Sequence, residues 1–395
     1  MSALLTIEDA LALVLERVQP LDVEQADLAV ASGRVLAEDV HATVDLPPFP
    51  SSAMDGFALK AGDTPGSLPI VGRIAAGRPA ERTLEAGEAM EISTGGVVPE
   101  GADAVVPIEV VAVEDNRLTV PAASEPGAHV RPVGGDVRRG DLLLAAGTVV
   151  RPALVGALAA AGVAAVTVSR RPRVMVLSTG TELRPPGEPL QPGQIYEANA
   201  VMLAAAARSA GAVAEALDPV EDDAEAHRAA FARGLDGDVL VTSGGVSVGP
   251  HDLVRRVEEG LGVEEVFWRV AVKPGKPVSF GVRGRTLVFG LPGNPVSALV
   301  GFELFVRPAL LALQRAEPGP FYRSGRLAAP ARRIPERDQL LRARSRLEDG
   351  ELFLEPLRGQ ESHMIASAAG ADALVLVPRG EGELAAGATT SYLTL

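Results

Sequence analysis

The stretch RPRVMVLSTGTEL (residues 171–183) decides the fold class of this sequence. A short apolar run, Arg173–Leu177, ends in a polar turn that contains glycine, which is typical of a buried strand followed by a loop. Similar runs recur at Val213–Leu217, Asp238–Val241 and Thr286–Phe289. Helical patterns follow them at Asn199–Ser209, Ala224–Arg233, Asp252–Glu259 and Pro295–Leu313. This alternation predicts a doubly wound parallel sheet with helices on both faces.

The sequence on either side of this region shows different patterns of apolar residues, glycine and proline. Residues 6–18 carry apolar side chains at helical spacing behind a Thr6/Asp9 capping box, and 148–170 reads as a helix followed by a strand. From about 41 to 147 short apolar runs alternate with glycine and proline clusters, and the tail from 320 onward again shows short strands. The predicted fold class is therefore α/β plus β, in several domains.

Composition excludes several functional classes. The 395 residues include 37 basic and 51 acidic side chains, giving a net charge of −14, which argues against a nucleic-acid partner. There is no cysteine, so disulfides, thiolate nucleophiles and cysteine-ligated metals are excluded. The first residues lack a basic signal region, and the most apolar run, Val149–Val168, contains Arg151 and Pro152. We therefore expect a cytoplasmic protein with no membrane span.

Polar, glycine-rich loops follow the predicted strands, and the carboxyl ends of parallel strands share one edge of a sheet. The loop 243–249 contains three glycines and two serines ahead of a helix, so its N–H groups can cradle an anion. We assign Ser243, Gly244, Gly245 and Ser247 as substrate-binding candidates, together with Pro292, Gly293, Asn294 and Pro295. The alternative is a ligand-free glycine turn at 243–249 and ordinary helix-start chemistry at Asn294 and Pro295.

Charged residues also gather in these loops. Lys273 and Lys276 lie three apart in KPGKP, where they can bind an oxyanion or form a solvated edge turn. Four acids follow different strands and suggest a Mg²⁺ site, namely Glu182, Asp222, Asp223 and Asp252. Helix capping is the alternative for the last three, since each precedes a helix. Asp55, Thr94 and Asp136 are ordinary turn residues when taken alone.

Six ordered motifs together carry a resemblance. They are PPFPSSAMDGFA (47–58), STGGVVPEGADAVV (93–106), STGTEL (178–183), TSGGVSVGPHD (242–252), KPGKP (273–277) and GLPGNPVS (290–297). This set resembles the molybdopterin molybdenumtransferase (MoeA) family and the E domain of gephyrin, and it extends over almost the whole chain. GQESH (359–363) is similar to the family's C-terminal domain. Pro50, Phe57 and Pro250 depart from the family's usual residues.

The resemblance implies an architecture. A first domain comprises 1–44 and 141–170, a β-rich domain of residues 45–140 is inserted into it, and residues 171–316 form an α/β domain similar to the MoaB/MogA adenylyltransferases. A small β-domain, 317–395, completes the chain. The family also implies a homodimer, with the cleft between the third domain of one subunit and the first two domains of its partner.

The resemblance also implies an activity. Adenylylated molybdopterin and molybdate would be converted, with Mg²⁺, to molybdenum cofactor and AMP. The residues carried over as catalytic are Asp55, Thr94, Asp136, Glu182, Asp222 and Asp252, and Glu182, Asp222 and Asp252 would bind the metal. The adenylyltransferase and molybdoenzymes are the other partners it implies.

Two other functions remain open at this stage. A non-enzymatic scaffold of the gephyrin type would bind a peptide without Mg²⁺ or nucleotide. A molybdopterin adenylyltransferase would bind ATP, but such enzymes are usually small single-domain chains.

Overall fold

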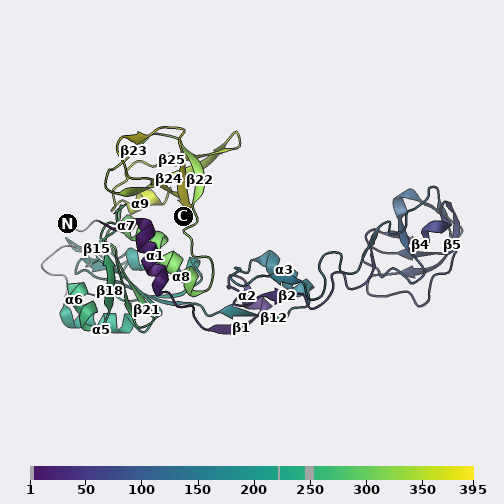
Figure 1. Cartoon of the computed structure of the whole chain (residues 1–395), viewed down its shortest axis with the longest axis horizontal. Coiled ribbons are helices and arrows are strands. Elements are labelled where there is room, and N and C mark those ends of the chain that lie inside the picture. The colour runs from purple at the N-terminus through teal and green to yellow at the C-terminus, as the bar shows by residue number, and fades with distance from the viewer. Residues whose placement is uncertain (1–3, 221–222, 245–252) are drawn as a thin grey trace. The chain divides into compact units, whose positions relative to one another are not determined.

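The structure is a computed structural model that describes residues 4–220, 223–244 and 253–395 (Figure 1). The chain forms two compact units. The larger unit comprises residues up to 24, residues 33–37 and residues 168–395, and the smaller unit comprises 25–32 and 38–167. Two of the boundaries between the units fall within the paired strands β1 (Val23–Asp27) and β12 (Ala165–Ser169).

A six-stranded mixed sheet forms the centre of the larger unit. Its order is β16-β13-β17-β21-β20-β18, with bounds Val213–Ala216, Arg173–Ser178, Val239–Ser243, Thr286–Leu291, Ser279–Arg283 and Glu264–Trp268. The first four strands are parallel, as predicted. The expectation of a wholly parallel sheet is wrong at the other edge, where β20 and β18 run antiparallel to their neighbours. Arg283 pairs with Thr286 across a two-residue turn, which is too short for a parallel crossover.

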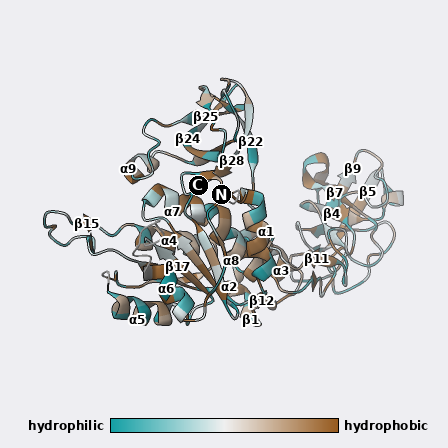
Figure 2. Ribbon diagram, turned by 60° about the vertical axis from the view of Figure 1, so that its left-hand side comes forward, coloured by the Kyte–Doolittle hydropathy of each residue, from teal (hydrophilic) through white to brown (hydrophobic). Residues whose placement is uncertain are grey.

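Helices cover both faces of this sheet, as predicted. Val174 and Val176 of β13 face one core with helices α1, α4, α7 and α8, and Met175 and Leu177 face a second core with α5 and α6. This alternation follows from the period of two along a strand. In Figure 2 the strands are mainly in the hydrophobic colour. The helix bounds are α1 Ile7–Arg17, α4 Asn199–Ser209, α5 Ala224–Gly234, α6 Leu253–Gly260, α7 Pro295–Gly301 and α8 Arg307–Leu313.

A π-helical segment, Phe302–Val306, joins α7 to α8. Pro308 lacks an N–H group and crowds the carbonyl four residues earlier, so the preceding turn widens. The continuous stretch Pro295–Leu313 is long and apolar enough to cross a membrane, but 78% of its most apolar 18-residue window is buried inside the protein. Its hydrophobicity is therefore explained by its place in the core.

The C-terminal part of the larger unit is a closed, barrel-like sheet. Strand β24 pairs with both β25 and β26, and the ring closes through β22 and β28. Its strands are β22 Arg323–Leu327, β24 Asp338–Glu348, β25 Glu351–Pro356, β26 Ala373–Val377 and β28 Thr389–Thr394, with β19 Val272–Lys273 added beside β24. Leu340, Leu374 and Leu393 join the main core of the unit. Smaller elements are β14 Leu183–Arg184, β15 Ile195–Tyr196, β23 Ala331–Arg332, β27 Glu383–Leu384 and α9 Ile365–Ala368.

The smaller unit is β-rich, as predicted. Its six-stranded sheet has the order β7-β4-β6-β5-β9-β8, with bounds Ala104–Pro107, Gly56–Leu59, Ala89–Ile92, Gly66–Ile74, Arg117–Val120 and Ala112–Glu114. Phe57 and Ala58 of β4 face two different cores. Other elements are β2 Val40–His41, β3 Ser51–Ser52, β10 Val130–Arg131, β11 Leu142–Leu144, α2 Leu28–Ala31, α3 Pro152–Ala160 and two 3₁₀ turns, Ala61–Asp63 and Ile108–Val110. The finer division into four domains stays a prediction.

Candidate functional site

The strand order reverses between β13 and β17. The first parallel strand, β13, has the second, β16, on one side and the third, β17, on the other. Ligands of doubly wound sheets bind outside the carboxyl ends of strands at such a point. Ser178, Ser243 and Leu291 end β13, β17 and β21, and they are in register with one another. Three of the predicted loops therefore begin side by side.

The side chain of Asn199 connects the loops after β17 and β21 by hydrogen bonds. Its Nδ2 donates to Ser243 Oγ at 2.8 Å and to the Gly293 carbonyl at 2.7 Å. A carbonyl only accepts, so the contact with Gly293 fixes which end of the amide is nitrogen. Asn199 Oδ1 is buried and has no hydrogen-bond partner among the described residues. Ser243 Oγ donates in turn to the Pro292 carbonyl at 3.2 Å.

A buried carboxylate holds the third loop. Glu197 is 5% exposed, and its Oε1 accepts hydrogen bonds from Ser178 Oγ at 2.8 Å and from the Ala200 N–H at 2.7 Å. Ser178 ends β13, and Ala200 lies in the first turn of α4. Glu197 therefore ties the loop after β13 to the helix that follows it.

These loops enclose a cavity of about 460 Å³. Its lining comes from the loops after β13 and β17, the start of α4, the loop before α7 and the barrel, and includes Thr179, Glu182, Asn199, Gly244, Gly293 and His363. Glycine is required at 244, where φ is +97° and a Cβ would lie 2.7 Å from the Thr179 carbonyl oxygen. Glu182 is exposed, and a Cβ at Gly180 would approach its carboxylate to 2.6 Å. The predicted loop residues Ser243, Gly244, Pro292 and Gly293 are thus brought together.

The barrel contributes a loop to the same cavity. Asn294 Nδ2 donates to Ser362 Oγ at 3.0 Å, and the Val296 N–H donates to the Ser362 carbonyl at 3.0 Å. Asn294 occupies the N-cap position of α7, as predicted, with Pro295 at the helix start, but its side chain makes no capping bond. The side chain of Asn294 instead links the α/β region to the barrel.

Arg342 of β24 holds this loop from behind. It is 1% exposed and donates to the carbonyls of Gly359 and Met364, both at 2.5 Å, and to Ser367 Oγ at 2.9 Å. Burial lowers the pKa of Arg342, and the charge of Glu361 acts in the opposite direction. Within the described part of the chain no carboxylate forms an ion pair with it. Arg342 therefore orders residues 359–364 through their backbone.

The KPGKP loop lies beside the start of α7. Gly275 has a φ of +106°, and a Cβ there would lie 3.4 Å from the Ser297 carbonyl oxygen. Lys273 pairs with Gln339 of the barrel through β19. Lys273 is exposed and Lys276 is half-buried. The loop is packed between two elements and is not a free edge turn.

In the smaller unit the structure brings together two of the three predicted residues. Asp55 Oδ1 accepts a hydrogen bond from the Thr94 N–H at 2.7 Å, and both residues are exposed. The Asp136 N–H donates to the Leu46 carbonyl at 2.8 Å. No hydrogen bond between described residues joins Asp136 to Asp55 or Thr94.

The other predicted site residues, Asp222, Gly245, Ser247 and Asp252, lie outside the described residues. The described chain reaches Val220, which pairs with Thr179 at the edge of the cavity. Asp223 is a helix cap, since its carboxylate accepts from the N–H groups of Glu225 and Ala226. No cluster of three or more metal-ligating side chains occurs within residues 4–220, 223–244 and 253–395.

Comparison with known proteins identifies the family. Residues 5–162 match the MoeA N-terminal region (domain I and II), 175–312 match a probable molybdopterin binding domain, and 324–395 match the MoeA C-terminal region (domain IV). The chain is 40% identical over 376 residues to molybdopterin molybdenumtransferase 2 of Mycobacterium tuberculosis, covering 91% of this chain and 92% of that protein. The chain belongs to the MoeA family.

Other MoeA-family proteins agree over the full length. Molybdopterin molybdenumtransferase of Haemophilus influenzae is 34% identical, covering 98% of both chains. The crystal structure of a molybdopterin biosynthesis MoeA protein from Pyrococcus horikoshii superposes with a TM-score of 0.86 at 27% identity, covering 99% of this chain and 100% of that one. The predicted family and fold class are confirmed.

Sequence reasoning missed three residues that organise this MoeA site. The sequence predicts no role for Glu197 or Asn199, and it places Arg342 only within a strand. A partial signal is present, because Glu197 and Asn199 offer two polar side chains at the start of a helix where one cap would suffice. Arg342 gave no signal, since an arginine in a strand is usually a solvated residue.

Proposed function

We propose that this chain is a molybdopterin molybdenumtransferase, which uses molybdate to convert adenylylated molybdopterin into molybdenum cofactor and AMP. The observation that carries this proposal is the cavity at the reversal of strand order, which is lined by glycine backbone and lies in the region that matches a molybdopterin binding domain. The names of the full-length relatives support the same activity.

The chemistry of the cavity suits oxyanions. Gly244 and Gly293 carry no side chain, so a diphosphate or molybdate can approach their backbone closely. Lys273 and Lys276 supply positive charge beside the start of α7, in a chain whose net charge is −14. We assign binding of the substrate's phosphate groups and of molybdate to these loops, together with Gly245, Ser247 and Asn294.

Mg²⁺ belongs to the proposal as a group held by Glu182, Asp222 and Asp252. Glu182 fits this role, because its exposed carboxylate faces the cavity and forms no ion pair within the described parts of the chain. Oxygen ligands are those that Mg²⁺ prefers. When bound, the ion would neutralise diphosphate charge and act as a Lewis acid.

The role of the smaller unit depends on assembly. We propose that Asp55, Thr94 and Asp136 serve the cavity of a second subunit in a homodimer. The exposed carboxylate of Asp55, oriented by the Thr94 N–H, is suited to contact such a ligand. A cytoplasmic location, and contacts with the adenylyltransferase and with molybdoenzymes, complete the proposal.

The test is AMP release from adenylylated molybdopterin with Mg²⁺, with and without molybdate. We expect molybdate-stimulated release in the parent and its loss in Glu182→Gln and Asp252→Asn. Glu188→Gln is the matched control, because Glu188 is exposed in the same connection and does not line the cavity. No release from a folded parent would refute the enzyme and favour a scaffold, and turnover of ATP instead would favour an adenylyltransferase.

A further inference from the structure

The strand β18 ends at the same edge of the sheet as the strands of the cavity. Trp268, its last residue, pairs with Ser279, which pairs with Gly290, which pairs with Thr242. Strand β18 is antiparallel to β20, which is antiparallel to β21, so β18 and β21 point the same way. The residue after Trp268 therefore emerges at the ligand-binding edge.

That residue, Arg269, has a left-handed backbone. Its φ is +79°, a conformation that glycine adopts freely and that a long side chain adopts at a cost. Its N–H donates to the Val278 carbonyl at 2.8 Å, which holds the conformation in place. Backbone strain of this kind concentrates at functional sites, where a particular side chain is needed.

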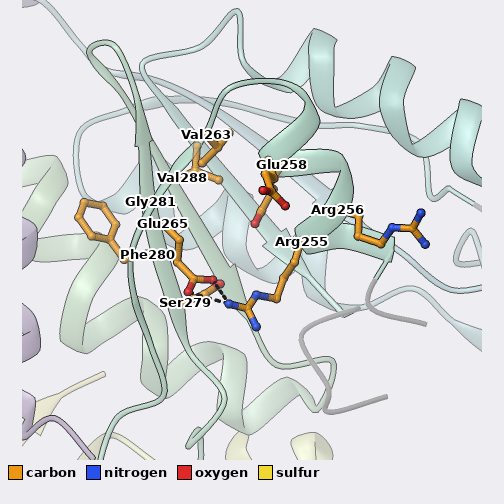
Figure 3. Close-up of a pocket in the computed structure, with 10 residues that line it drawn as sticks. Arg255, Arg256, Glu258, Val263, Glu265, Ser279, Phe280, Gly281 and Val288 are labelled. Atoms are coloured by element: carbon orange, nitrogen blue, oxygen red, sulfur yellow. Dashed lines mark hydrogen bonds and ion pairs between the residues drawn. The ribbon is translucent and has the colours of Figure 1, made fainter. Parts of the chain in front are cut away.

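The guanidinium of Arg269 is fixed but not neutralised. Its Cζ lies 3.6 Å from the centroid of the Trp268 ring. It forms no hydrogen bond or ion pair with any residue that the structure describes. Arg255 also contacts Trp268, at 4.8 Å, but its guanidinium binds the Glu265 carboxylate at 2.5 Å. Figure 3 shows this pair beside a cavity of about 600 Å³. The Arg255 guanidinium is therefore paired with a carboxylate, whereas the N–H donors of the Arg269 guanidinium make no hydrogen bond to a described residue.

Arg269 also adjoins the KPGKP loop. The N–H of the next residue, Val270, donates to the Lys276 carbonyl at 3.0 Å. The backbones of Arg269 and Lys276 are therefore close to each other where the loop begins and ends. Arg269, Lys273 and Lys276 bring three cations into eight residues. A planar guanidinium donates two parallel hydrogen bonds to a tetrahedral oxyanion, which an ammonium cannot do.

We propose that Arg269, whose guanidinium lies over the Trp268 ring, binds a tetrahedral oxyanion at the same edge of the sheet as the cavity. The anion is the phosphate of the nucleotide or the molybdate ion, both of which present the same oxygen geometry. The inference rests on the proposed function for the identity of these ligands, but it is tested by binding alone.

The experiment is calorimetric titration of the full chain with AMP, with adenosine and with molybdate. The variant is Arg269→Asn, since asparagine tolerates the left-handed conformation and removes the charge. Arg283→Asn is the matched control, because Arg283 is exposed at the opposite end of β20 and the net charge changes equally. Arg269→Lys keeps the charge and loses the planar fork.

We expect Arg269→Asn to weaken AMP or molybdate about 10- to 100-fold, the range for a hydrogen bond to a charged group. Adenosine binding and the Arg283→Asn control should be unchanged, with Arg269→Lys intermediate. A loss for AMP alone identifies the phosphate, and a loss for molybdate alone identifies the metal oxyanion. Unchanged affinity for both anions overturns the proposal, as does an equal loss for adenosine, or a parent that binds neither anion. A parent that binds both anions with the expected losses but releases no AMP refutes the proposed function and leaves this inference intact.

Discussion

Substitutions of Asn199 test how the cavity is built. We expect the conservative change to aspartate to lower the free energy of unfolding more than the truncation to alanine. Asn199→Ala removes hydrogen bonds to Ser243 and Gly293 at 2.8 and 2.7 Å. At about 1 kcal/mol each, the free energy of unfolding should fall by about 2 kcal/mol. Asn199→Asp preserves the shape of the side chain but puts a carboxylate oxygen 2.7 Å from the Gly293 carbonyl.

The aspartate variant should therefore lose more than the alanine variant at pH 7. A buried charge without a partner costs about 3–5 kcal/mol. Its folded-state pKa is raised above the ordinary value of about 3.9, so the folded variant binds more protons than the unfolded one. Lowering the pH then stabilises it relative to the parent, by up to about 1.4 kcal/mol per pH unit between the folded pKa and pH 4.

Denaturant unfolding followed by tryptophan fluorescence measures this directly, since Trp268 is the only tryptophan and lies in the same unit. Asn294→Asp is the control. Asn294 is exposed, and the Ser362 hydroxyl can turn to donate to a carboxylate, so we expect a change below about 1 kcal/mol. The reasoning is refuted if Asn199→Asp is as stable as the parent at pH 7, or more stable than Asn199→Ala.

Three other perturbations follow from single contacts. Gly244→Ala should destabilise by about 2 kcal/mol more than Gly293→Ala in thermal unfolding, because a Cβ at 244 would lie 2.7 Å from the Thr179 oxygen whereas one at 293 would lie 3.6 Å from Gly244 Cα; equal shifts would contradict this. Arg342→Met should cost about 2–4 kcal/mol and open residues 359–364 to limited proteolysis, since buried carbonyls lose their donor; an unchanged cleavage pattern would argue against the positioning role. Burial alone would raise the pKa of Asp238, but hydrogen bonds from Arg170 and from the Arg173 N–H outweigh it, so the pKa lies below its usual 3.8. Asp238→Asn should therefore cost about 1–2 kcal/mol at pH 7, and the parent's advantage should begin to shrink below about pH 4 and be lost as the pH falls through the lowered pKa of the folded protein; a constant gap in pH-dependent denaturation would show that the ion pair contributes nothing.

The parallel strands could be predicted because burial on both faces requires continuous apolar runs. Arg173–Ser178 and Val239–Ser243 show such runs, and both strands lie where they were expected. Strand β18 escaped prediction because it begins with Glu264 and Glu265, and as the edge strand it is exposed to solvent along one side, so its composition is free to vary. Strand β20 lies inside the sheet and escaped prediction because it begins with Ser279 and is interrupted by Gly281.

The sequence predicts which loops form the site, because that depends only on the order of elements along the chain. Each loop was identified because it follows a strand, and parallel strands align their ends. The partners of Asn199 lie 44 and 94 residues away, and those of Arg342 lie in a loop after the next strand. Which polar groups meet inside the cavity depends on register and side-chain direction, which no local pattern encodes.

The location of the proposed anion site follows from which cationic side chains have no carboxylate partner among the described residues. The sequence contains three lysines, Lys60, Lys273 and Lys276, and two of them flank a single glycine turn. Several arginines of the larger unit are instead committed to carboxylates, as Arg170 is to Asp238 and Arg307 is to Glu303. Within the described chain Lys273, Lys276 and Arg269 form no such pairs, so their field is not cancelled locally. A net charge of −14 is therefore compatible with anion binding, because a ligand responds to the charges within a Debye length of about 8–10 Å and not to the total.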